Sequence, residues 1–230
     1  GCNQRLKDQR PAALIARLVS VPIFLIVGGY SLMSGLLEAR AWAQIDRPLA
    51  QILAEASGST FTLLPARSHR YRRAQMDLCL RSATDPTALV FPPAAITALA
   101  SACEGRATAI LADAPTHAAA LAVTALSQGS QLLDRSWAFA PFEGWLAAQR
   151  FSLGYNRFPS VDGTVAYQGI VDDAALLVSL GHVDEVALAY VEATGFRKAF
   201  GLKLPSLPAS DQRRFLATVE ALGIGADDGL

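Results

Sequence analysis

An uncharged stretch of twenty residues, 18–37 (LVSVPIFLIVGGYSLMSGLL), constrains this chain more than any other part of its sequence. The hydrocarbon core of a bilayer is about 30 Å thick, and about 20 apolar helical residues, each rising about 1.5 Å, cross it. The length therefore predicts a transmembrane helix over residues 18–37. A cleaved signal peptide is the alternative, because the A-x-A patterns at residues 39–41 and 41–43 suit a signal peptidase. Under both interpretations the chain that follows is exported.

The charges beside this stretch predict its orientation. Residues 1–17 contain one acidic and four basic side chains: Asp8, Arg5, Lys7, Arg10 and Arg17. Basic residues stay preferentially on the cytoplasmic side of a membrane, so we expect residues 1–17 to form a cytoplasmic segment. Arginine outnumbers lysine and alanine is abundant, which is typical of GC-rich bacterial genomes. The sequence thus predicts a protein of the bacterial inner membrane whose main domain is periplasmic.

Three small residues of the stretch share one face of the expected helix. Gly28, Ser31 and Gly35 lie three and four positions apart, and small residues allow a second helix to approach closely in lipid. This pattern favours a transmembrane packing face, used with another copy of the chain or with a membrane partner. Glycine and serine are also frequent in spanning helices that make no such contact, so this alternative stays open.

The net charge of the whole chain hides one basic segment. Lys+Arg and Asp+Glu both number 20, whereas nucleic-acid-binding domains usually carry a basic excess, so we expect no nucleic-acid partner. Residues 66–73 (ARSHRYRR) contain a candidate basic patch of Arg67, Arg70, Arg72 and Arg73. Such a patch suits an anionic polymer, a lipid headgroup or an acidic partner. The alternative is a solvated helix start whose arginines pair with Asp77 or Asp85.

Two of the three cysteines are expected to be bonded. Cys2 is cytoplasmic in the predicted topology, whereas Cys79 and Cys103 are exported, and disulfides persist in oxidising compartments. Cys79 and Cys103 belong to successive amphipathic stretches, so we expect a disulfide between neighbouring helices. Two buried free thiols are the alternative. No CxxC pair or paired histidines accompany the cysteines, so we expect no metal site.

Proline and glycine divide the exported chain in the order that helices prefer. A first helix is expected over residues 45–56, continuing or restarting after Pro48. Later segments begin near residues 92, 115, 142, 161 and 183 and are expected to end before Gly105, Gly129, Gly154, Gly181 and Gly195. Ser210 is expected to cap a last helix that runs to residue 222. Residues 61–64 alone look extended, without a partner strand, so the sequence predicts an all-α fold.

The candidate chemical groups are few. Trp137, Phe142 and Trp145 form a candidate aromatic cluster, for sugar stacking or for the core between two helices. The carboxylates Asp172 and Asp173 are adjacent, point about 100° apart on a helix and are expected on a solvated face. The chain lacks the motifs of nucleotide-binding loops, nucleophile elbows and zinc proteases. We therefore predict no catalytic, cofactor-binding or metal-ligating residues.

Segments in the second half of the chain resemble a known type of protein. They read PTHAAALAVTALSQG (115–129), APFEGWLAAQRFSL (140–153) and LPASDQRRFLATV (207–219). Over residues 110–222 the chain is similar to degenerate tetratricopeptide repeats and to uncharacterised single-span envelope proteins of proteobacteria. The resemblance implies a scaffold or adaptor with a tetratricopeptide-like exported domain, in the setting of envelope or exopolysaccharide genes. It implies no catalytic residues.

These observations predict a domain order and a function. The expected parts are a cytoplasmic segment (1–17), a transmembrane helix (18–37), a membrane-proximal helical region (38–109), a helical-repeat-like domain (110–222) and a disordered tail (223–230). The expected function is a membrane-anchored periplasmic adaptor that binds an envelope protein or a second copy of the chain, with polysaccharide as a further candidate partner. The alternative is a glycan-binding protein or a glycan-acting enzyme that uses carboxylates such as Glu143 or Asp173.

Overall fold

The computed structural model is all-helical over the residues that it describes. It describes the backbone of residues 5–58, 61–65, 68–157 and 165–222, and the side chains of these ranges apart from 5–24, 156–157 and 165–167. These ranges contain eleven α-helices, two short 3-10 helices and no strand, so the predicted all-α class is confirmed. The tail expected to be disordered, 223–230, lies outside the described residues.

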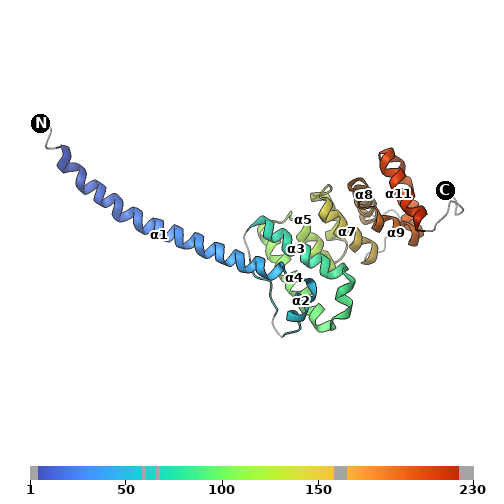
Figure 1. Ribbon diagram of the computed structural model, residues 1–230, viewed down its shortest axis with the longest axis horizontal. Helices are drawn as coiled ribbons and strands as arrows, with labels where there is room; N and C mark the ends of the chain where they lie inside the picture. The colour runs from blue at the N-terminus through green and yellow to red at the C-terminus, as the bar shows by residue number, and fades with distance from the viewer. Residues whose placement is uncertain (1–4, 59–60, 66–67, 158–164, 223–230) are drawn as a thin grey trace.

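The first helix, α1 (Arg5–Ile45), extends far from the rest of the molecule (Figure 1). At about 1.5 Å per residue its length is about 60 Å. Its last turns pack on α3 (His69–Thr84), where Ala41 and Ile45 are buried and the ring of Trp42 meets Tyr71 edge-on at 5.6 Å between centroids. The helix stops before Pro48, which has no backbone N–H to donate, and α2 (Leu49–Ala56) begins directly after it.

The predicted transmembrane helix falls within α1. Among the described residues, no helix combines the length and the apolar character that crossing a membrane requires. The structure describes the side chains of the predicted span from Leu25 onward, and those of residues 18–24 lie outside its described part.

The remaining helices form the body of the molecule. They are η1 (Pro86–Val90), α4 (Pro93–Asp113), α5 (Ala118–Gln128), α6 (Gln131–Phe139), α7 (Gly144–Arg157), α8 (Val165–Leu180), α9 (Asp184–Glu192), α10 (Thr194–Lys203), η2 (Leu204–Ser206) and α11 (Ala209–Ala221). Helices that follow one another in the chain mostly pack side by side. The helix α3 also packs on helices distant in the chain, because it contacts α1, α4, α5 and α7. Figure 1 shows α2 to α5 near the base of α1 and α8, α9 and α11 at the opposite end.

One hydrophobic core connects these helices. It extends along the chain from Ala41 to Val219. The predicted boundary between residues 38–109 and 110–222 falls inside α4, and Ala107 and Ile110, on its two sides, both belong to this core. The body is therefore continuous across that boundary.

Glycine ends some of the predicted helices and not others. Gly129 and Gly181 have φ of 103° and 91° and terminate α5 and α8 as expected, because this conformation suits glycine. The predicted ends at Gly105 and Gly154 are wrong, since α4 and α7 continue through them. A helical glycine costs about 1 kcal/mol relative to alanine, and burial of the residues that follow it outweighs this cost. Ser210 lies inside α11, which begins after Pro208 rather than at a serine cap.

The segment expected to be extended, residues 61–64, is held by a side chain in place of a strand. The Gln44 side-chain amide donates to the Thr62 carbonyl at 2.8 Å, and its oxygen accepts from the Leu64 amide at 2.9 Å. The Gln44 side chain thus pairs with a backbone carbonyl and a backbone amide that a neighbouring strand would otherwise bind. The two hydrogen bonds attach the segment to the base of α1.

Gly169→Ala is expected to destabilise the fold. An added Cβ at Gly169 would overlap the Trp137 ring atoms Cδ2, Cε3 and Cε2, and this ring is fixed by a hydrogen bond to Asp173. Overpacking typically costs about 1–3 kcal/mol, which exceeds the gain of up to about 1 kcal/mol in helix propensity. Gly105→Ala is the control, because nothing lies within 4 Å of its added Cβ. Urea unfolding should give Gly169→Ala a lower free energy of unfolding than the wild type and Gly105→Ala a higher one. Equal changes in the two variants would contradict the close contact between position 169 and the Trp137 ring.

Candidate functional site

The arginines of the predicted basic patch do not all lie at one site in the structure. Arg67 lies outside the described residues. Arg72 donates to Asp113 at 2.9 Å, so its charge is paired within the fold. Arg70 and Arg73 are exposed on the first turns of α3 and, together with Trp42 and Trp145, line a hollow of 480 Å³. Two of the four arginines thus share one surface site.

The residues of the predicted aromatic cluster occupy three different environments. Trp137 is buried and donates its Nε1 hydrogen to Asp173. Phe142 precedes α7 with its side chain 84% exposed. Trp145 donates to Glu143 Oε2 at 2.9 Å and lies beneath the Arg73 guanidinium, whose carbon is 4.4 Å from the ring centroid. The sequence did not indicate that Trp145 would meet Trp42 and the basic segment.

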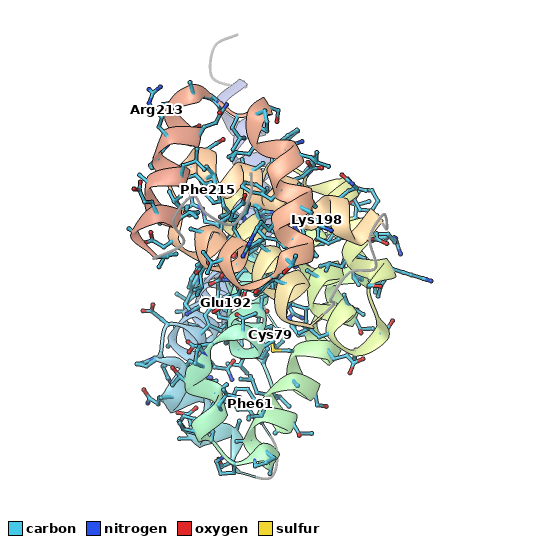
Figure 2. All side chains as sticks on the ribbon, turned by 90° about the vertical axis from the view of Figure 1, so that its right-hand side faces the viewer. Phe61, Cys79, Glu192, Lys198, Arg213 and Phe215 are labelled. Carbon is cyan, nitrogen blue, oxygen red and sulfur yellow. A yellow bond between two sulfur atoms is a disulfide. The ribbon has the colours of Figure 1, made fainter. Side chains whose placement is uncertain are left out.

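Cys79 and Cys103, the two cysteines expected to pair, form a disulfide in the structure. It joins α3 to α4, and the Cα atoms are 5.7 Å apart. Both residues are buried in the core, and the bond between them is the yellow stick beside Cys79 in Figure 2.

The three residues of the predicted transmembrane packing face, Gly28, Ser31 and Gly35, lie on the part of α1 that projects from the body. All three are exposed, and nothing lies within 4 Å of an added Cβ at either glycine. The described part of the chain leaves space beside both glycines, and the use of this face by a second helix stays a prediction.

A buried ion pair is the main polar feature that the sequence interpretation missed. Arg150 (0% exposed) and Asp173 (1% exposed) meet in the core, with Arg150 Nη2 2.7 Å from Asp173 Oδ1 and Nε 3.0 Å from Oδ2. Arg150 Nη1 also donates to the Ser136 and Ala140 carbonyls at 3.1 and 2.9 Å. Together with Trp137, this network joins α6, α7 and α8.

Burial has the largest effect on the pKa of the carboxyl in this ion pair. Burial raises the pKa of the Asp173 carboxyl to about 6, against the opposing effect of the hydrogen bonds and charge of Arg150 and the hydrogen bond from Trp137. Both carboxylate oxygens are engaged and shielded from solvent. Asp173 was expected on a solvated face, and that prediction is wrong. Its carboxyl is also inaccessible to a glycan, in contrast to the role considered for it in an enzyme.

The structure brings together two histidines that are distant in sequence. The rings of His69 and His117 are 6.0 Å apart between centroids, and His117 Nδ1 accepts from the Ala120 amide at the start of α5. Burial, followed by the nearby His69, lowers the pKa of His117. Among the described residues no three His, Cys, Asp or Glu side chains are grouped in a way that could hold a metal ion.

Comparisons with known proteins add no relatives. The chain matches no protein-family model, and comparison with curated proteins and with solved structures gives no match.

Proposed function

We propose that the chain is a membrane-anchored periplasmic adaptor, held by residues 18–37 of α1, whose helical body binds other envelope proteins. The tetratricopeptide-like character of residues 110–222 and the envelope or exopolysaccharide setting are part of this proposal and come from the resemblance. One observation carries the proposal: the apolar surface of α1 where it leaves the body.

Large apolar side chains are exposed on α1 where it leaves the body. Eight of them are 52–71% exposed: Leu25, Ile26, Val27, Tyr30, Leu32, Met33, Leu36 and Leu37. Burying such a side chain fully contributes about 1.5–3 kcal/mol, so covering all eight is worth on the order of 10 kcal/mol. An exposed apolar surface of this extent is typical of membrane or protein contact sites.

The distribution of these side chains around α1 favours lipid over a single protein partner. At about 100° per residue they cover about two-thirds of the circumference, and much of the remainder holds Gly28, Ser31 and Gly35. A helix that packs on one soluble partner has a narrower apolar stripe and a polar opposite face. Lipid can cover the wide sector, while a second membrane helix can approach the small residues.

Two further features support the exported adaptor. The Cys79–Cys103 disulfide suits an oxidising compartment such as the periplasm. Leu89 and Val90 of η1 expose 82% and 80% of their side chains on the body, where a protein partner could bury them.

The anchor is tested by introducing charge into α1. Leu25→Arg/Leu32→Arg places two charges on one face of the exposed part of α1, within five residues of the middle of the predicted span, and each charge costs about 2.5–3.5 kcal/mol at the centre of a bilayer. After expression of the full chain in bacteria, the wild type is expected to stay in the membrane pellet through alkaline carbonate extraction. The double variant is expected in the supernatant.

The control carries the same two charges on the body. Leu89→Arg/Leu202→Arg changes leucines that are 82% and 87% exposed, and it is expected to stay in the pellet. Release of the wild type by carbonate, or equal retention of both double variants, would contradict the anchor. Crosslinking from membranes, with Gly28, Ser31 and Gly35 each changed to Leu, then tests the packing face: unchanged partners would exclude it.

A further inference from the structure

We infer that the hollow lined by Trp42, Arg70, Arg73 and Trp145 binds the phosphate of an anionic phospholipid headgroup. This inference rests on the proposed membrane anchor and assigns a ligand to a site at its base. The hollow has a volume of 480 Å³ and is formed by the end of α1, the first turns of α3 and the start of α7. Ala74 and Asp77 complete its lining.

The donors of this hollow are available. Neither the Arg70 nor the Arg73 side chain forms an ion pair or a hydrogen bond with another described residue, whereas the acidic residue of the hollow, Asp77, is paired with Arg81 at 2.9 Å. The Arg73 guanidinium lies over Trp145, which restrains the side chain without using its N–H groups. Guanidinium groups bind phosphate oxygens through such donors.

Folding alone does not favour these charges. The N-terminal end of a helix carries partial positive charge, so anionic side chains stabilise it and cationic ones oppose it. The first turn of α3 contains no acidic residue and places Arg70 one position after His69. Asp113 offsets Arg72, but no described carboxylate pairs with Arg70. A bound anion at this position would stabilise both arginines and the helix end.

The position of the hollow selects a lipid as the source of that anion. Trp42 follows Leu37, the last of the eight exposed apolar residues named above, by five positions, or about 7.5 Å along the helix. Because Ala41 is already buried in the body, no flexible linker separates the body from the apolar part of α1. The hollow therefore lies at headgroup depth when Leu37 is at the edge of the hydrocarbon. Tryptophan is also enriched at this depth.

The test uses the full chain in vesicles in which phosphatidylglycerol progressively replaces phosphatidylcholine at constant ionic strength. Trp42 and Trp145 line the hollow, so tryptophan emission reports its occupation. The wild type is expected to show a saturable change. Each arginine near a charged membrane surface strengthens binding about fivefold, so Arg70→Gln/Arg73→Gln should weaken phosphatidylglycerol binding by about 30-fold, and its emission change should no longer saturate within the titration.

The control removes two charges elsewhere. Lys198→Gln/Arg213→Gln changes exposed residues of α10 and α11, and Figure 2 shows Arg213 on the outer side of α11. This variant is expected to respond as the wild type does. Thermal unfolding followed by circular dichroism should show that Arg70→Gln/Arg73→Gln folds, with a midpoint close to that of the control, because removing the unfavourable Arg70 charge at the helix end offsets the lost contact between Arg73 and Trp145.

Several outcomes would overturn the inference. Equal responses of the two double variants would mean that net charge, and not this hollow, senses the lipid. Saturation by inorganic phosphate or by an acidic oligosaccharide in phosphatidylcholine vesicles would assign the hollow to a free anion or to a glycan. Carbonate extraction of the same vesicles separates this inference from the anchor: a retained chain without a phosphatidylglycerol response refutes the headgroup site alone, whereas a released chain refutes the anchor.

Discussion

Arg150→Met is expected to lower the free energy of unfolding by about 3–5 kcal/mol at pH 8. Methionine is unbranched and fills much of the space of the arginine stem, so the main change is the loss of the charge and its donors. The Asp173 carboxylate would stay buried without its cation, and the Ala140 carbonyl would lose the hydrogen bond from Arg150. Removing one partner of a buried ion pair typically costs this much, because an uncompensated charge remains in the core.

The free energy of unfolding that Arg150→Met loses should be smaller at pH 6 than at pH 8. In the wild type, burial holds the pKa of Asp173 at about 6, above its unfolded value of 3.8, so the contribution of this group to stability falls as the pH rises from about 4 to 6 and is constant above. Arg150 lowers this pKa, and its removal therefore raises it further. The folded variant then retains a proton above pH 6 that the unfolded chain has released, so its stability keeps falling toward pH 8.

A neighbouring ion pair provides the matched control. Lys203 lies 2.8 Å from Asp172, a distance close to that of the buried pair, but the two side chains are 41% and 59% exposed. Exposed pairs contribute about 0–1 kcal/mol, so Lys203→Met should cost less than about 1 kcal/mol at both pH values. Urea unfolding of both variants at pH 6 and pH 8 measures the difference. Equal losses in the two variants, or a loss in Arg150→Met that does not depend on pH, would contradict the role assigned to burial.

The sequence contained a signal for the buried pair that the interpretation did not use. Arg150 continues the apolar stripe of Leu146 and Ala147, four and three positions before it, and Asp173 lies beside Ala174 in the stripe of α8. Opposite charges within the apolar stripes of successive helices indicate pairing across the helix contact. The adjacent pair Asp172–Asp173 looked solvated as a unit, although only the first residue is.

The helical class was predictable because proline and glycine divide the chain, but the helix ends depended on packing. Gly129 and Gly181 adopt positive φ and end their helices, whereas Gly105 and Gly154 have helical conformations that neighbouring residues stabilise. The sequence alone does not distinguish a glycine that ends a helix from one inside a helix. For the same reason α10 (Thr194–Lys203) was not predicted, because its Gly195 was interpreted as the end of the preceding helix.

The hollow at the base of α1 could be predicted only in parts. The basic segment and Trp145 were both recognised as candidates, but they are more than seventy residues apart in the chain and meet because α3 packs on α7. Trp42 joins them because α1 continues without interruption into the body. Such a site depends on tertiary contacts between three helices, which local patterns do not encode.

Removing the Cys79–Cys103 disulfide is expected to lower the free energy of unfolding by about 3 kcal/mol. The bond links residues 24 positions apart in the sequence, and closing a loop of this length restricts the unfolded chain by about that amount in the chain-entropy model. The double variant Cys79→Ala/Cys103→Ala, compared with the oxidised wild type by urea unfolding, measures the loss.

The third cysteine and a reductant make this experiment specific. Dithiothreitol should destabilise the wild type by about as much as the double substitution does, and it should leave the double variant unchanged. Cys2→Ala should behave as the wild type in both conditions, because Cys2 is not a member of the bond. A wild type that is equally stable with and without reductant would contradict the contribution of the disulfide.

The same bond should protect exported chains in cells. Chains retained in a reducing cytoplasm should be degraded by proteases faster than exported ones, since the reduced body unfolds more readily. Pulse-chase labelling with and without export measures this difference.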